Sequence, residues 1–428
     1  MEEIKVRKRK DTFIEIDKLA PDPKKFWSVD FLKVWMMLLV ILDHSVPHDI
    51  LGWFYSVFWQ RIAIPVFMVV LGFNWAKSLS RKKDQSLGSL YSWNDYWKPK
   101  IKRFVVPYAI IFGLSIIFYG VMFLVSGPDF LYNIYSPGVP PDSPLALPSL
   151  HNPWLKLALI LPIWGPGNWF VPLIFLLIII FPLLYKFFTL TRWFSWIALP
   201  IFYVAEMAFQ YSGRYVVNTF GFDWYMNFFT FIPLQLLTAI GLGMWLSIDH
   251  RWDVARNAVI WVLGIASLVF IIYSVSTGGY PRFAIMFAVY DYNLFIYPYS
   301  ALLVMLILNI IPKSPQGQNF RNFSFVSRAT YHILMTQIFY FSVVYSLLLN
   351  MNAPFGFEWR ADGLGGVYWV FTNLPRFLWF YPLNVLITFG IGIGWYALDK
   401  RVSGGKHVAK KKMSQKQRDM MKAKGWIK

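Results

Sequence analysis

The feature that most constrains this chain is a repeated apolar run of about 20 residues, long enough to cross a bilayer core of roughly 30 Å. Lipid offers no hydrogen-bond partners to open backbone groups, so each run must be helical. Ten such runs are predicted, at residues 29–47, 54–75, 104–126, 168–188, 193–210, 225–247, 257–275, 292–311, 328–350 and 376–398. We therefore expect an all-α fold, a polytopic integral membrane helix bundle with about ten transmembrane helices, and a soluble enzyme is excluded.

Charged residues are few and unevenly placed. The chain has 41 Lys and Arg against 22 Asp and Glu, a net charge of +19. With the N-terminus inside and the spans alternating, the outer loops hold few basic residues: Lys156, Arg214, Arg282, Arg360 and Arg376. The positive-inside rule predicts this asymmetry, so both termini are expected in the cytoplasm and the chain in the plasma membrane as a multi-pass protein. The basicity marks topology rather than nucleic-acid binding.

The expected organisation is a single membrane domain at 29–398, between a basic cytoplasmic N-terminal segment at 1–28 and a basic tail at 399–428. The N-terminal segment lacks the apolar stretch of a signal peptide. A Pro-rich outer loop precedes residues 154–164, which are too short to span and are expected to dip in from outside as a half-helix. The tail either lies on the anionic inner leaflet or stays disordered.

A few ionisable side chains fall inside the predicted spans, where charge is costly and marks a candidate functional site. At a rise of about 1.5 Å per residue, Asp43, His44, Arg61 and Glu206 are expected in one layer of the outer half, with Lys33 some three turns below His44. An imidazole titrates near neutral pH, so His44 is a candidate general base. The alternatives are a polar residue at a helix end for His44 and a structural ion pair for Arg61.

Two carboxylates are candidates for orienting His44. Asp43 is its neighbour, but consecutive residues lie about 100° apart around a helix and do not share a face, so Glu206 from another span is an equal candidate. The sequence has no Cys, which removes thiolate chemistry, and no metal-binding motif, so no metal is expected.

Four segments carry a resemblance to a known family. They are SVDFLKVWMMLLVILDH at 28–44, IPVFMVVLGF at 64–73, KPKIKRFVVPY at 98–108 and GNWFVPLIFLLIIIFPLL at 167–184, with weaker support from ATYHILMTQ at 329–337. On these motifs the chain resembles the membrane-bound acyltransferase family 3, over most of the ten-span region. Two positions depart from the family pattern, because Lys33 stands where members have Arg and Gln337 where many have His.

The resemblance implies transfer of an acyl group, usually acetyl, from cytoplasmic acyl-CoA to a sugar hydroxyl on a surface glycan or lipid-linked saccharide. The expected donor-binding cations are Lys33, Lys98, Lys100, Lys102 and Arg103, which gather where a CoA phosphate would enter. The alternative is that these cations only set the topology of the chain in the membrane and bind no ligand.

We expect the pantetheine arm to rise between spans 1, 2 and 3 toward His44, with Arg61 stabilising the thioester oxyanion. Trp164, Asn168 and Trp169 at the outer mouth are expected to bind the sugar, with an aromatic belt as the alternative. A saccharide or lipid transporter or exporter without acyl transfer is the competing class, and a sensor or structural membrane protein the third. The resemblance favours the enzyme.

Overall fold

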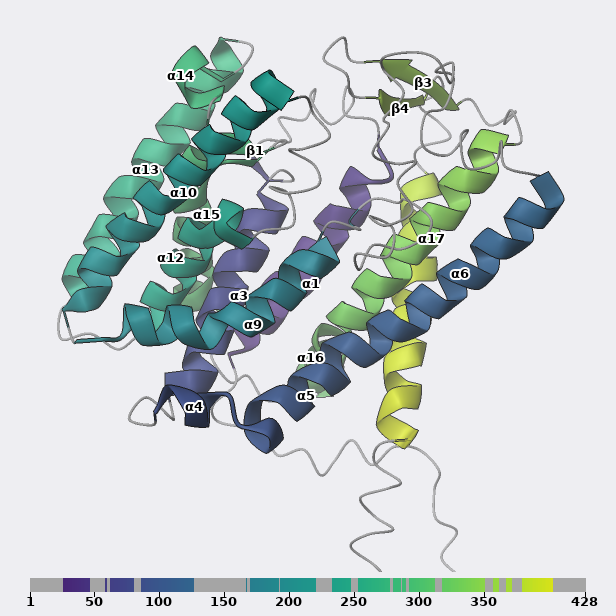
Figure 1. Cartoon of the computed structure of the whole chain (residues 1–428), viewed down its shortest axis with the longest axis horizontal. Helices are drawn as coiled ribbons and strands as arrows, with labels where there is room; N and C mark the ends of the chain where they lie inside the picture. Colours follow the sequence, from purple (N-terminus) through teal and green to yellow (C-terminus); the bar gives the residue numbers. More distant parts are fainter. Residues whose placement is uncertain are drawn as a thin grey trace, which may run out of the picture.

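The computed structural model describes residues 26–46, 58–59, 62–80, 86–126, 167, 170–191, 193–220, 233–247, 253–277, 280–285, 287–289, 292–311, 318–350, 357–361, 367–371 and 379–402. These residues form a helix bundle, with two small antiparallel hairpins near one end (Figure 1). The expected all-α class is confirmed.

Each of the ten predicted spans corresponds to a helix. In chain order these helices are α1 (Trp27–Asp43), α3 (Ala63–Leu79), α6 (Val106–Ser126), α9 (Phe170–Phe188), α10 (Phe194–Phe220), α12 (Leu237–Ser247), α13 (Asp253–Ser276), α15 (Tyr297–Ile310), α17 (Thr330–Asn350) and the C-terminal helix Trp379–Val402. Within the described ranges, four helical stretches are long and apolar enough to cross a membrane: Trp93–Val125, Phe170–Phe188, Val254–Ser276 and Trp379–Val402. The full number of crossings and the side on which the termini lie stay predictions.

Shorter elements connect or flank the long helices. They are α4 (Leu87–Leu90), α5 (Lys98–Lys100), α14 (Arg282–Ile285) and α16 (Gln318–Arg328), the π-helical turns η4 (Trp93–Trp97) and η5 (Ile101–Val105), and the 3-10 turns η8 (Pro233–Leu236) and η9 (Leu294–Ile296). Strand β1 (Ala288–Val289) pairs with β2 (Tyr292–Asn293), and β3 (Phe357–Ala361) with β4 (Val367–Phe371) in the register Phe357↔Phe371 to Ala361↔Val367.

Several predicted boundaries are wrong. Span 2, predicted to end at residue 75, continues as helix α3 to Leu79, so that Lys77 lies on the helix. The helix of span 5 runs to Phe220, ten residues beyond the prediction. Helix α16 was not predicted at all.

Close helix packing holds the centre of the bundle together. A Cβ on Gly72 would collide with the backbone carbonyl of Ile240, and one on Gly243 with that of Val69, so α3 and α12 cross with their backbones nearly touching. Gly392 packs in the same way on Ile333 of α17. These contacts fix α3, which forms a wall of the site described below.

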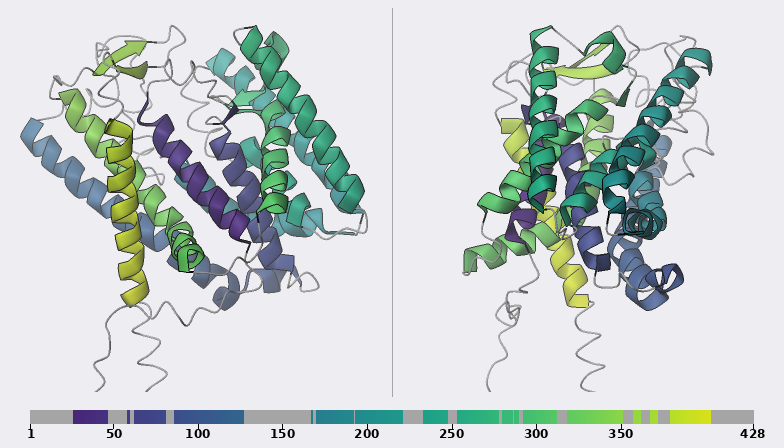
Figure 2. Two further views of the ribbon diagram at one scale, coloured as in Figure 1. Left: turned by 180° about the vertical axis from the view of Figure 1, so that it is seen from behind. Right: turned by 90° about the vertical axis from the view of Figure 1, so that its left-hand side faces the viewer.

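The start of α1 and the end of the C-terminal helix lie at the same end of the bundle, together with α4, α5 and α16 (Figures 1 and 2). The β3–β4 hairpin and α14 lie at the opposite end. Helix α1 therefore runs from one end of the bundle toward the other. It carries Lys33 near its start and His44 just past its end.

Candidate active site

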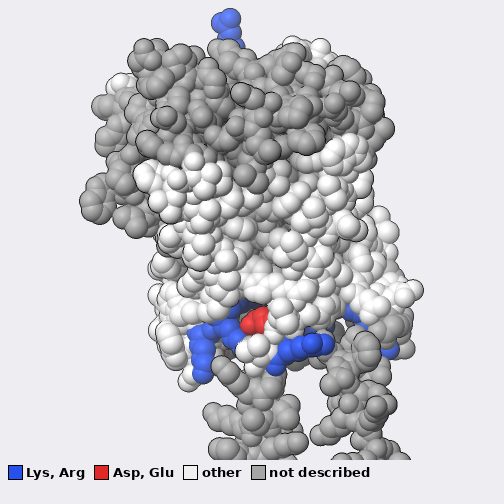
Figure 3. Space-filling view, turned by 90° about the vertical axis from the view of Figure 1, so that its right-hand side faces the viewer, with Lys and Arg blue, Asp and Glu red and all other residues white. Residues whose placement is uncertain are grey.

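Two cavities open beside the first half of α1. The basic cavity, of about 560 Å³, is lined by Phe26, Val29, Asp30, Lys33, Phe73, Asn74, Lys77, Ser78, Pro99, Lys102, Arg103, Arg328, Tyr331, His332, Tyr396, Asp399 and Lys400. Six of these residues are Lys or Arg and two are Asp, so the lining carries an excess of positive charge. Figure 3 shows Lys and Arg gathered at this end on one face of the molecule, below a broad band without charge.

The apolar cavity, of about 420 Å³, lies next to the basic one. Its lining includes side chains from α1, α3, α9 and α17, among them Met37, Phe67, Phe170 and Leu334. Six residues line both cavities: Lys33, Asn74, Ser78, Pro99, Arg103 and Tyr331. Lys33 thus lies at the junction, where a ligand with an anionic head and a less polar arm has a place for each part.

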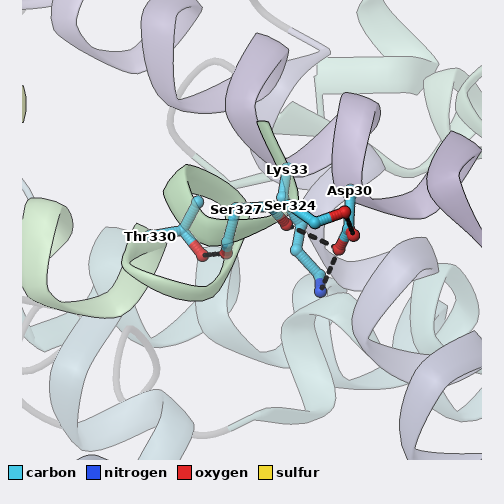
Figure 4. Close-up of polar contacts among 5 residues, drawn as sticks. All are labelled: Asp30, Lys33, Ser324, Ser327 and Thr330. Carbon is cyan, nitrogen blue, oxygen red and sulfur yellow. Dashed lines mark hydrogen bonds and ion pairs between the residues drawn. The ribbon is translucent and has the colours of Figure 1, made fainter. Parts of the chain in front are cut away.

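A polar cluster holds Lys33 at this junction (Figure 4). The buried Asp30 lies one turn before it on α1, with Oδ1 3.7 Å from Lys33 Nζ. Ser324 and Ser327 of α16 donate hydroxyl hydrogen bonds to the two oxygens of Asp30, at 2.8 and 2.7 Å. Because charge-assisted bonds of this kind contribute about 1.5–3 kcal/mol, Asp30 fixes both α16 and the direction of Lys33.

The predicted donor-binding cations are brought together only in part. Lys33, Lys102 and Arg103 line the basic cavity. Lys100 lines the apolar cavity, and its ammonium lies 3.3 Å from the centroid of the Trp75 ring, a cation–π contact. Lys98 is exposed and lines neither cavity.

Three cations of the basic cavity were missed by the sequence reasoning: Lys77, Arg328 and Lys400. The helical spacing of α3 and the amphipathic pattern of α16 could have predicted that Lys77 and Arg328 lie near this cavity. The approach of Lys400 depends on how the C-terminal helix packs. The π-helical turns around the predicted basic motif, which rotate Tyr96 and Arg103 toward the cavities, have no signal in the sequence.

His44 lies at the other end of α1, in the turn that ends the helix. Its Nδ1 is 3.8 Å from Asp43 Oδ2, and both side chains are about one-fifth exposed. The edge of the Phe341 ring on α17 meets the imidazole, with ring centroids 5.9 Å apart. Of the two candidate carboxylates, Asp43 thus lies beside the imidazole, as its place in the sequence predicts.

Glu206, the other candidate carboxylate, is fully buried on α10. Its Oε2 accepts from the backbone N–H of Thr238 at 2.7 Å, and its Oε1 from Gln210 Nε2 at 2.9 Å. Glu206 thus serves the start of α12, where free N–H groups and the helix dipole favour an anion. Asp43 is the carboxylate that the geometry assigns to His44.

The remaining predicted residues, Arg61, Trp164, Asn168 and Trp169, lie outside the described residues, as does the half-helix expected at 154–164. His332 and Gln337 lie on α17, where the His332 ring packs against Trp395 and Tyr396. Of the described residues, no group of three or more His, Cys, Asp or Glu side chains is arranged to hold a metal ion.

The long apolar helices define a helical membrane protein, with a basic cavity near the start of α1 and an imidazole beside a carboxylate at its end. A family model described as an acyltransferase domain matches residues 26–393, so the chain belongs to the acyltransferase family 3 and is a membrane acyltransferase. No curated protein and no solved structure showed significant similarity to the chain. The family assignment gives no support to the transporter alternative.

Proposed function

We propose that this acyltransferase moves an acyl group, acetyl in the simplest case, from cytoplasmic acyl-CoA to a hydroxyl of a surface glycan or lipid-linked saccharide. The observation that carries the proposal is the division of α1 into two ends. A cavity rich in cations surrounds Lys33, and an imidazole beside a carboxylate lies at His44. The first end suits an anionic donor, and the second suits removal of a proton from a hydroxyl.

The basic cavity supports a donor that carries phosphate groups. CoA bears a pyrophosphate and a ribose phosphate, and cations on several helices surround the cavity. Arg103 and Arg328 present planar forks that bind phosphate oxygens in pairs, while Lys33, Lys77, Lys102 and Lys400 add point charges. The adjoining apolar cavity is where the pantetheine arm is proposed to lie.

The path from donor to base follows α1. The cavity lining on this helix reaches Met37, seven residues before His44 and so roughly 10 Å away along the axis. The thioester must cover this distance for the reaction to occur at His44. Residues outside the described ranges, Arg61 among them, complete the path in this proposal.

At the far end His44 takes the proton of the acceptor hydroxyl as the oxygen attacks the thioester carbonyl. Asp43 stabilises the imidazolium that forms. CoA thiolate leaves and carries the charge, and the proton held by His44 returns to the leaving sulfur or to solvent. Arg61 remains the proposed oxyanion partner, and Trp164, Asn168 and Trp169 the proposed sugar contacts.

The test is turnover by the purified protein in lipid vesicles supplied with radiolabelled acetyl-CoA and a saccharide extract. We expect loss of the thioester, release of free CoA thiol and transfer of label to the saccharide fraction, each abolished in His44→Ala. An exporter would move saccharide across the vesicle without acetyl-CoA and leave the thioester intact. That outcome, or wild-type turnover in a folded His44→Ala protein, would reject the proposal.

A further inference from the structure

The turn that carries His44 is fastened to the C-terminal helix by a single buried amide. Asn384 is fully buried, and its Nδ2 donates to the Ser45 hydroxyl oxygen at 2.9 Å. Ser45 follows His44 directly, and its own hydroxyl donates to the Ile41 carbonyl at 2.6 Å, one turn back on α1. The amide therefore holds the residue next to the imidazole, in the last turn of α1, where the backbone N–H groups of His44 and Ser45 donate to the carbonyls of Val40 and Leu42.

The other end of the same amide is fastened to α17. Tyr340 donates its hydroxyl to Asn384 Oδ1 at 2.8 Å, and the next residue, Phe341, is the one whose ring meets His44. An uncharged chain of hydrogen bonds thus joins three helices at Ser45, the residue that follows His44. One turn earlier on the C-terminal helix, Tyr381 donates to the Leu38 carbonyl at 3.3 Å, which ties the body of α1 to the same helix.

We propose that Asn384 is a positioning residue for the reaction, which fixes the turn and the side wall that aim His44 at the acceptor hydroxyl. This inference rests on the proposed role of His44. It adds Asn384, with Tyr340 and Ser45, to the groups on which turnover depends, although none of the three touches the reacting atoms. Nothing in the sequence motifs points to these positions.

The magnitude follows from how sharply proton transfer depends on geometry. A shift of 1 Å in a reacting group can lower the rate by about 10²-fold, and a general base must be within hydrogen-bond reach of the proton that it takes. Loss of the Asn384 amide frees the Ser45 turn from the C-terminal helix and leaves the Tyr340 hydroxyl without its acceptor. The imidazole then has a wider range of positions.

The experiment compares acetyl transfer by Asn384→Ala, Asn384→Asp and Tyr340→Phe with two matched controls. Ser342→Ala and Thr388→Val each remove a buried hydroxyl near the network that bonds within its own helix, to the carbonyls of Ile338 and Asn384. We expect kcat to fall about 10- to 100-fold in Asn384→Ala and about 3- to 10-fold in Tyr340→Phe, with KM for acetyl-CoA within twofold. Both controls should keep kcat within twofold.

Asn384→Asp is the conservative variant, because its oxygens can accept from both Tyr340 and a reoriented Ser45 hydroxyl. It should recover most of the turnover lost in Asn384→Ala.

Thermal unfolding of each purified variant separates a misplaced base from a misfolded protein. Wild-type kcat in a folded Asn384→Ala protein, or an equal loss in Ser342→Ala, would overturn the positioning role. So would a loss confined to KM, or turnover in Asn384→Asp that is no higher than in Asn384→Ala. Failure of the proposed function looks different, because a folded His44→Ala protein would then keep its turnover whatever Asn384 does.

Discussion

The two ends of α1 are surrounded by different kinds of interaction. Around Lys33 the contacts are charged: six cations and two carboxylates line an open cavity, and several of them can do the same task. Around His44 the described contacts include a chain of uncharged hydrogen bonds, in which the Asn384 amide joins α1, α17 and the C-terminal helix. Several cations that act together suit binding, where each ion contributes a little. A directional hydrogen-bond chain suits chemistry, where the position of the reacting group decides the rate.

Substitutions at the two ends of α1 should therefore impair different properties, CoA binding at the Lys33 end and kcat at the His44 end. Of these substitutions, His44→Ala should show the largest effect. General-base catalysis typically contributes about 10²- to 10⁴-fold, so kcat should fall by that factor. The Kd of CoA, measured by calorimetry on the same preparation, should stay at the wild-type value because His44 lines neither cavity. A variant that loses CoA binding as well would show that the two ends are one site.

Asp30→Ala should have the next largest effect, and on stability first. It removes the carboxylate that faces the Lys33 ammonium and accepts from two serine hydroxyls, and a hydrogen bond to a charged group contributes about 1.5–3 kcal/mol. We expect a free energy of unfolding lower by about 2–3 kcal/mol, read as a lower midpoint of denaturant unfolding, together with weaker CoA binding. Asp30→Asn keeps two acceptor contacts at most and should lie between this variant and the wild type. Unchanged unfolding in Asp30→Ala would contradict the anchoring of α16.

Much of the bundle follows from the sequence. Apolar runs of about 20 residues predict where helices form. Neither lipid nor a protein core offers water to the backbone, so its N–H and C=O groups must bond to one another. Their ends are less predictable, because α3 continues to Leu79 and α10 to Phe220, both beyond the ends predicted from their apolar runs. Helix α16 was missed because its apolar face is a stripe rather than a run, and it packs Phe320 and Phe323 on Trp27.

The site divides in the same way. Lys33 and His44 stand out in the sequence as ionisable residues in apolar surroundings. Their partners do not, because Ser327 and Asn384 are polar residues of common type that acquire a role only when distant helices meet. Helical periodicity alone left Asp43 and Glu206 as equal candidates for His44, and the hydrogen bonds of Glu206 with Thr238 and Gln210 could not be predicted from the sequence.

A third prediction compares two lysines that the sequence analysis assigned to donor binding, Lys33 and Lys98. Lys33→Ala should weaken CoA binding about tenfold with kcat at saturation unchanged, because Lys33 lines both cavities and is already oriented by Asp30. Lys98→Ala should change the Kd less than twofold, since Lys98 is exposed and lines neither. Raising the salt concentration should weaken binding in the wild type and narrow the difference between the two variants. Equal effects of the two substitutions would mean that the cavity does not select among the cations.

Glu206→Gln should have the smallest effect on turnover and decides which carboxylate belongs to His44. The new side chain keeps one oxygen for the Thr238 N–H, and its amide can donate to Gln210 once that side chain turns its oxygen around. The start of α12 stays capped, so we expect kcat within twofold of wild type and a small change in the unfolding midpoint. Asp43→Asn, tested beside it, removes the charge 3.8 Å from the imidazole and should lower kcat by a larger factor. The reverse order would return Glu206 to the reaction and show that the His44 end extends across to α10.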